Sequence, residues 1–295
     1  MKKHIFYFIL ATIAVLFSCD KNQVVEPTPE PNPKPEEKLK VNLGFALEGT
    51  KATDTAFETG DIVGLYMVYG TASAASNYVN NLALSYNGSQ WSGDSFYWKD
   101  SSTQADFYAY SPRATVTDMK AWTFHVQTNQ SALNAYKASD LVWGTRKAVT
   151  PTEERITVTT KHIMSSLSIN VVPGVGFSEE ELAAANVSVE IMSMKTAANV
   201  DLTSGSATAS GDTGSVIPYN AGTYWRAVLV PQTVADGSQL IVVKVNGEAY
   251  TLRQGFTFES GKKHSCTVTV KKSSSGISIG LGDWETGSNF SGDAQ

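Results

Sequence analysis

The stretch VNLGFAL, residues 41–47, decides how the folded body of this chain begins. Large apolar residues stand at every second position, and small or polar residues stand between them. The apolar positions are Val41, Leu43, Phe45 and Leu47. Because successive side chains of a strand point to opposite faces, this alternation predicts a β-strand with one buried face. The polar residues 48–56 that follow are expected to form an exposed loop carrying Lys51.

Similar short segments recur through the rest of the chain and predict an all-β protein. They are apolar at alternate positions or throughout, and clusters of Gly, Asn, Ser and Asp separate them. This spacing is typical of sandwiches of antiparallel strands. The expected strands are residues 62–69, 96–98, 106–110, 122–126, 155–160, 167–172, 187–191, 225–230, 240–245, 250–252 and 265–270.

Helical signals are few, and the segment GFSEEELAAA carries the strongest of them. Ser178 stands as an N-cap, and Glu181 follows three residues later, which is the spacing of a capping box. This predicts a short helix at residues 179–185, and residues 129–138 are a second candidate.

The folded body is long enough for two domains of ordinary size. We place the boundary between them at the break around Pro151. The expected parts of the body are an N-terminal sandwich at 41–150, a C-terminal sandwich at 151–272 and a tail at 273–295.

The N-terminal end predicts export as a lipoprotein. Two lysines precede an uncharged run at residues 5–17, which is shorter than the ~20 residues that span a bilayer. The run ends in Leu16-Phe17-Ser18-Cys19, which resembles a bacterial lipobox. In this interpretation residues 1–18 are a signal peptide, and the sulfur of Cys19 carries a lipid such as palmitate. The alternative is an ordinary signal peptide with a chance cysteine.

Residues 19–40 have the composition of a tether. Proline occupies every odd position of residues 27–35, so five of the ten prolines of the chain lie there. Alternating proline favours the extended polyproline II conformation. A disordered N-terminus with the same composition is the alternative.

Composition excludes several kinds of partner. The net charge is −5 and no basic run stands out, so nucleic acid is not expected to bind.

Cys266 lies in an alternating apolar segment and is expected to be a buried strand residue, which rules out a disulfide framework. No histidines or cysteines have the spacing of metal ligands, and His162 is expected to be a hydrogen-bonded structural histidine. We expect neither metal nor cofactor.

Catalytic signals are weak. No motif of a phosphate-binding loop or of a nucleophile elbow occurs. Asp283 and Glu285 flank Trp284, but nothing places an opposing carboxylate at the separation that glycoside hydrolysis needs. The chain is therefore not expected to be an enzyme.

Six blocks stand in order along the chain: LFSCD (16–20), TKAT…F…GDIVGLY (50–66), SDLVWG (139–144), ITVTTKHIMSSLSINV (156–171), VLVPQTV (228–234) and DWE.G (283–287). In their order and spacing they resemble the fimbrillin-like lipoproteins of the Bacteroidales, the subunits of type V pili and their relatives. Two departures are Lys51, where arginine is commoner, and the serine pair 165–166, where the family more often has an alanine.

The resemblance implies two transthyretin-like β-sandwich domains and assembly by strand exchange. A trypsin-like protease would cut between Lys51 and Ala52, residues 41–47 would leave, and a strand of a neighbouring subunit would fill the groove. Four large apolar side chains contribute on the order of 6–12 kcal/mol when buried. This approaches the ~5–15 kcal/mol that stabilises an ordinary domain. The cleaved domain is therefore expected to need a replacement strand.

The tail offers a candidate donor strand. Ile277, Ile279 and Leu281 share one face, and Trp284 is out of phase with them unless Gly282 allows a bulge. The alternative is a last edge strand that stays in the subunit's own sheet.

Three functions follow as alternatives. The first is a pilin-like subunit of a surface fimbrium, partnered by other pilin subunits and attached to the outer membrane through Cys19. The second is a surface lipoprotein that does not polymerise and serves as an anchor, a tip adhesin or a module for a surface glycan or protein. The third is an enzyme using Asp283 and Glu285.

Overall fold

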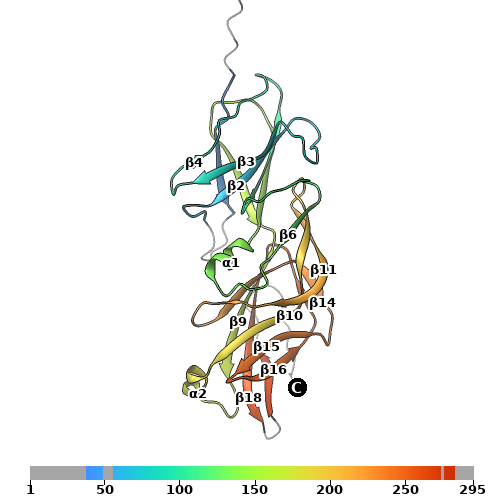
Figure 1. Ribbon diagram of the computed structural model, residues 1–295. Coiled ribbons are helices and arrows are strands. Elements are labelled where there is room, and N and C mark those ends of the chain that lie inside the picture. The colour runs from blue at the N-terminus through green and yellow to red at the C-terminus, as the bar shows by residue number, and fades with distance from the viewer. Residues whose placement is uncertain (1–37, 49–55, 274–275, 283–295) are drawn as a thin grey trace, which may run out of the picture. The chain divides into compact units, whose positions relative to one another are not determined.

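The computed structural model describes residues 38–48, 56–273 and 276–282. These residues are nearly all strand, with two short helices, so the predicted all-β class is confirmed (Figure 1). Among the residues described, no helix is both long enough and apolar enough to cross a bilayer.

The first sheet has seven strands in the order β1-β8-β7-β5-β2-β3-β4. Its neighbours are antiparallel except β1 and β8, which run parallel. Its strands are β1 (Leu43–Leu47), β2 (Ile62–Val68), β3 (Val79–Tyr86), β4 (Trp91–Ser92), β5 (Ala105–Ser111), β7 (Val142–Val149) and β8 (Ile156–His162).

Two further sheets pack face to face as a β-sandwich. The second has the order β11-β10-β15-β16, with β6 also paired to β10, and the third has the order β12-β13-β9-β18-β19. The strands of the second sheet are β6 (Trp122–His125), β10 (Val187–Asp201), β11 (Ser206–Val216), β15 (Gln239–Val245) and β16 (Glu248–Arg253). Those of the third are β9 (Ser165–Pro173), β12 (Tyr219–Asn220), β13 (Trp225–Leu229), β18 (Lys263–Ser273) and β19 (Gly276–Gly282).

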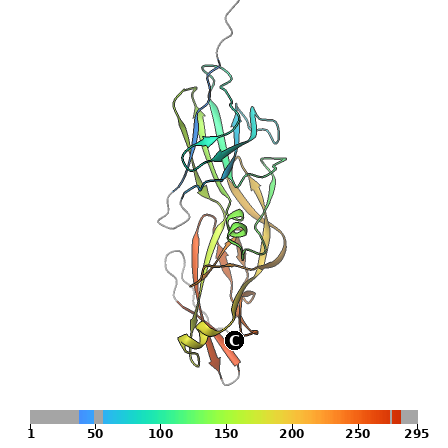
Figure 2. The ribbon, with the colours of Figure 1, turned by 60° about the vertical axis from the view of Figure 1, so that its left-hand side comes forward.

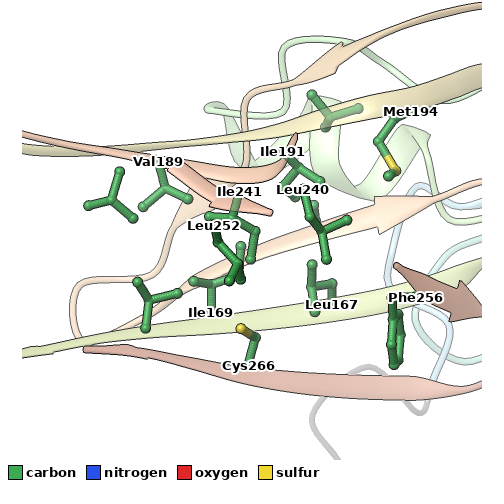
Figure 3. Close-up of a cluster of buried hydrophobic side chains, with 14 of the residues drawn as sticks. Leu167, Ile169, Val189, Ile191, Met194, Leu240, Ile241, Leu252, Phe256 and Cys266 are labelled. Carbon is green, nitrogen blue, oxygen red and sulfur yellow. The ribbon is translucent and has the colours of Figure 1, made fainter. Parts of the chain in front are cut away.

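The core of this sandwich is apolar. Figure 3 shows side chains of β9, β10, β15, β16 and β18 meeting between the sheets. Ile191 and Leu252 come from one sheet, and Ile169 and Cys266 from the other. Cys266 is thus the small buried strand residue that its alternating segment predicts, and burial raises the pKa of its thiol to about 12. At neutral pH this thiol stays protonated and is a poor nucleophile.

The remaining elements are short. β14 (Gln232–Val234) pairs with β17 (Phe256–Phe258), and helix α1 is Leu133–Ala138. Helix α2 is Glu179–Ala184 and has the predicted capping box, with Ser178 accepting from the Glu181 backbone. Figure 2 shows α2 in yellow beside the end of β9.

A further apolar cluster joins the first sheet to the sandwich. β2 and β5 contribute Leu65 and Phe107 to the core of the first sheet, whereas their neighbours Tyr66 and Tyr108 lie in a cluster with Val200 of β10. A strand buried on both faces shows a continuous apolar run, and IVGLYMV of β2 is such a run. The two parts of the body therefore share buried surface rather than meeting at an exposed linker.

The expected boundaries differ from the observed ones. β8 follows Pro151 but pairs with β7 and β1, so the chain stays in the first sheet until His162. Pro151 lies in the connection of two neighbouring strands, which has the same turn residues as a linker. At the other end Lys40 pairs with Tyr97, so the last residues assigned to the tether belong to the folded unit.

The observed strands also differ from the expected ones in several places, and β3, β7 and β11 have no counterpart among the expected strands. Residues 96–98 form a bridge rather than a strand. β10 continues to Asp201, ten residues beyond the expected end at Ile191. The prediction ended too early because bulges interrupt the alternation of side chains there, as the positive φ of Ser193 (59°) illustrates. β11 was not predicted, since its small polar residues show no apolar period and it is held by pairing with β10.

Gly205, in the turn between β10 and β11, is expected to be intolerant of a side chain. Its φ is +73°, and an added Cβ would lie 2.3 Å from Cε3 of the buried Trp143 indole. The indole is fixed, because its Nε1 donates to the Leu202 carbonyl at 2.8 Å. Gly205→Ala should lower the free energy of unfolding by about 2 kcal/mol, as measured by urea denaturation.

Gly222→Ala is the matched control for this prediction. Gly222 has φ +96° with nothing within 4 Å of an added Cβ, so this change tests backbone strain alone. Equal losses in the two variants would show that contact with Trp143 is unimportant.

Candidate functional site: the first strand and its groove

β1 lies at one end of the strand order of the first sheet and appears in blue in Figure 1. Its residues run parallel to β8, in a register from Leu43 opposite Ile156 to Leu47 opposite Thr160. Among the residues that the structure describes, no strand forms a ladder on its other side. The strand that the sequence predicted to leave therefore lies at a sheet edge.

Backbone hydrogen bonds fasten β1 mainly to β8. The N–H of Ile156 donates to the Asn42 carbonyl (2.9 Å), and the N–H of Glu48 donates to the Thr160 carbonyl (2.7 Å). The Thr160 hydroxyl adds a bond to the Ala46 carbonyl at 3.1 Å. These bonds hold both ends of β1 against one neighbouring strand.

The residues just before β1 are held from the other side as well. The N–H of Val41 donates to the Phe96 carbonyl at 3.0 Å, and the N–H of Trp98 donates to the Leu39 carbonyl at 2.8 Å. The segment that enters β1 is thus fixed on two sides, whereas residues 43–47 are fixed on one.

The apolar face of β1 enters the core of the first sheet. Val41 and Phe45 are 4% and 8% exposed, and both belong to the cluster that contains Ile156. Leu43 packs against this cluster but, like Leu47, is half-buried. The predicted alternation is therefore realised fully at two positions and partly at the other two.

An aromatic wall lines the groove that holds Phe45. The Phe45 ring meets the edge of Trp91 with centroids 4.9 Å apart and planes at 80°. Trp91 in turn stacks on Tyr86 at 4.9 Å and meets Phe57 edge-on at 5.0 Å. Trp91 comes from β4, at the opposite end of the strand order, so the sheet curls until its two ends share this core. Sequence reasoning missed this wall, because Trp91 stands among polar residues.

The C-terminal end of β1 borders a small pocket of about 110 Å³. Leu47 and Ala56, the residues near either end of the predicted cleavage loop, both line it. The pocket is framed by two ion pairs, Lys137 with Glu58 at 2.6 Å and His162 with Asp140 at 2.8 Å.

The second ion pair confirms His162 as a hydrogen-bonded structural histidine, since its Nδ1 bonds the carboxylate of Asp140. The other buried histidine, His264, lies against the rings of Phe256 and Phe258 at 5.0 and 5.9 Å. Burial lowers the pKa of His264, which keeps it neutral in the core. The residues described contain no group of three or more His, Cys, Asp or Glu that could hold a metal.

The described part of the tail, β19, pairs within its own chain. The backbone of β19 pairs antiparallel with β18, from Gly276 opposite Ser273 to Gly282 opposite Thr267. This is the arrangement of an edge strand that stays in the subunit's own sheet, which is the alternative to a strand donated to a neighbouring subunit. The predicted donor-strand residues in β19 are described by their backbone alone, and these are Ile277, Ile279 and Leu281. The other predicted site residues lie outside the described residues, and these are Cys19, Lys51, Ala52, Asp283, Trp284 and Glu285.

Comparisons with known proteins agree with this fold. A model of the family described as fimbrillin-like matches residues 50–284. A candidate fimbrium subunit of Bacteroides uniformis, Fim1C, is 27% identical over 303 residues, covering 97% of this chain and 97% of that protein.

Solved structures share the same architecture. A candidate cell adhesion protein of Bacteroides uniformis matches with a TM-score of 0.64 and 20% identity, over 84% of this chain and 97% of that one. Another, of Bacteroides ovatus, matches with a TM-score of 0.61 and 16% identity over the same shares, 84% and 97%. At these identities the structural matches support the fold alone.

Proposed function

This chain belongs to the fimbrillin-like family, and we propose that it is a structural subunit of a cell-surface fimbrium that supports adhesion. In this proposal the chain reaches the outer membrane as a lipoprotein through Cys19. A trypsin-like protease then cuts between Lys51 and Ala52, and β1 leaves. A strand of a neighbouring subunit takes its place, and repetition of this exchange builds the polymer.

The observation that carries the proposal is the place of β1 at the edge of the first sheet. Removing an edge strand breaks one ladder and leaves the other strands paired. The departure of Val41 and Phe45 would uncover Trp91 and Ile156 along a groove. A new strand can enter such a groove by main-chain hydrogen bonds to β8, with its side chains filling alternate pockets.

The position of the cleavage loop also suits the proposal. Leu47 and Ala56 line one pocket, and the residues after Ala56 are tied to α1 by the Glu58–Lys137 ion pair. A cut between them would therefore free β1 while the following chain stays attached to the body.

The tail is the proposed donor. β19 occupies an edge of the third sheet, so its release from β18 would leave the other strands of that sheet paired. Ile277, Ile279 and Leu281 would then face the groove of the next subunit, and Trp284 would follow them past Gly282.

A second candidate function is favoured by the pairing of β19 with β18. A chain that keeps both edge strands would be a surface lipoprotein of the same fold that does not polymerise, as an anchor or a tip adhesin. It would retain residues 19–51 at its N-terminus.

Mass spectrometry of the mature N-terminus tests the proposal on protein recovered from the cell surface. We expect the wild-type chain to begin at Ala52, because Lys51 offers a trypsin-like cut in the loop after β1. Lys51→Ala should instead begin at lipid-modified Cys19 and should not give the ladder of polymers that we expect from the wild-type chain on gels.

Lys40→Ala is the matched control, since it removes a lysine before β1 and should leave the product beginning at Ala52. Wild-type protein that begins at lipid-modified Cys19 would contradict strand removal and support the second candidate function.

A further inference from the structure

A small pocket of about 260 Å³ lies on the first sheet away from β1, where β2 ends and β3 begins. Tyr69 follows β2 and Tyr78 precedes β3, and their rings meet edge-on with centroids 5.0 Å apart and planes at 84°. Tyr78 is 46% exposed, which is high for so large an aromatic side chain. The Tyr69 ring therefore holds the Tyr78 ring in place while much of Tyr78 stays open to solvent.

The loop that carries Tyr78 is held firmly. Asn77 closes it by accepting from the Ser73 N–H (2.9 Å) and donating to the Ser73 carbonyl (3.0 Å). The N–H of the buried Met119 donates to the Ala74 carbonyl at 2.8 Å, which ties the loop to the body. A ligand entering this pocket would find its walls already in position.

Lys99 gives the pocket a positive charge. Its backbone N–H donates to the Tyr69 hydroxyl at 2.8 Å, and its Nζ lies 5.7 Å from the Tyr69 ring centroid. Within the part of the chain that is described, no carboxylate lies within 4.0 Å of this ammonium, since the ion pairs there involve Lys137 and His162.

The neighbouring carboxylate, Asp100, is occupied elsewhere. It accepts hydrogen bonds from the N–H groups of Ser102 (2.9 Å) and Thr103 (2.6 Å) and from the Thr103 hydroxyl (2.7 Å). These bonds lower the pKa of Asp100 to about 2 and keep it turned into its own loop. Burial and, to a smaller extent, the charge of Asp100 raise the pKa of Tyr69, but the hydrogen bonds of Asp100 are made within its own loop and not to Lys99.

We propose that this pocket binds a sugar unit that carries a carboxylate. The exposed Tyr78 ring offers a flat surface to the C–H face of a pyranose, and Lys99 pairs with the acid group. The hydroxyls of Thr71 and Ser76, on the same lining, can bond the ring hydroxyls. The volume is just below the ~300–1,000 Å³ typical of sites for drug-sized ligands, so it suits one monosaccharide.

The ligand could come from a uronic-acid polysaccharide or from a glycan that ends in sialic acid. This site is independent of strand exchange, so failure of either proposal leaves the other standing.

Saturation-transfer NMR titration of the full chain tests the proposal. The probes are methyl β-D-glucuronide and the methyl α-glycoside of N-acetylneuraminic acid, with methyl β-D-glucoside as the neutral counterpart. We expect saturable binding of at least one acid, about fivefold tighter than the neutral sugar. Which acid binds identifies the source. Absence of saturation by both acids at about 10 mM would overturn the proposal.

Variants assign the binding to this pocket. Tyr78→Ala should weaken the acid sugar about tenfold, whereas Tyr78→Phe, which keeps the ring, should stay near wild type. Lys99→Gln should remove the preference for the acid over the neutral sugar. Tyr97→Ala is the matched control, because Tyr97 is 40% exposed and lies outside this pocket. Wild-type affinity in a folded Tyr78→Ala chain would contradict the assignment.

Discussion

Replacing Phe45 by Asp should lower the free energy of unfolding of the uncleaved chain by about 5 kcal/mol. Phe45 is 8% exposed and lies against Trp91, so the change removes a buried ring and places a carboxylate in an apolar groove. The loss is comparable with the whole stability of many domains, ~5–15 kcal/mol. Urea denaturation followed by tryptophan fluorescence measures it, with Trp91 among the six tryptophans that contribute to the signal.

Asn42→Asp is the matched control, because it puts the same carboxylate on the same segment at an exposed position. The Asn42 carbonyl still accepts from Ile156 in this variant, so stability should change by less than about 0.5 kcal/mol. If Phe45→Asp unfolds at the wild-type urea concentration, burial of Phe45 does not hold β1 in place, and the expectation that the cleaved chain needs a replacement strand is wrong.

The same contact bears on assembly. If cleavage removes β1, the chain loses the packing of Phe45 against Trp91, which Phe45→Asp also disrupts. It loses the hydrogen bonds between β1 and β8 as well. A destabilised Phe45→Asp precursor would therefore indicate how strongly the cleaved chain is driven to accept a replacement strand.

Gln130→Ala should lower the free energy of unfolding by about 4 kcal/mol, although Gln130 itself lies in neither a helix nor a strand. The side chain is 0% exposed. Its Nε2 donates to the carbonyls of Val228 (2.7 Å) and Gln127 (3.0 Å), and its Oε1 accepts from the Val228 N–H (2.9 Å). The amide thus bonds to Val228 as a neighbouring strand would, and alanine leaves the two buried backbone groups of Val228 and the part-buried carbonyl of Gln127 without this partner.

Gln127→Ala is the control for this prediction. Gln127 is exposed, and its backbone carbonyl is unchanged by the substitution. Its stability should stay within about 0.5 kcal/mol of wild type in the same urea measurement. A Gln130→Ala chain as stable as this control would mean that other groups satisfy Val228.

Much of the candidate site could be predicted from local pattern. The alternation of residues 41–47 requires no knowledge of the fold, because a period of two places Val41 and Phe45 on one face of any strand. The capping box of Ser178 and Glu181 is equally local and appears as predicted. The parallel register of β1 on β8 was not predictable, since it joins segments more than a hundred residues apart.

The partners of the site were also hidden from the sequence. Trp91 stands among polar residues and touches Phe45 because the first sheet curls until β4 meets β1. Gln130 has no apolar neighbours in sequence that signal burial, yet it is enclosed by the shared cluster between sheets. Both depend on contacts between distant segments, which periodicity does not report.

The all-β class, the buried face of the first strand and the capped helix could be predicted from the sequence, because each depends on residues a few positions apart. The folded chain was needed to show that Pro151 lies in a strand connection, that the two parts share an apolar core, and that β1 and β19 both lie at sheet edges. Burial and strand pairing depend on which distant segments meet, and no local pattern reports those meetings. The edge positions of β1 and β19, on which the proposed exchange depends, belong to this second kind of information.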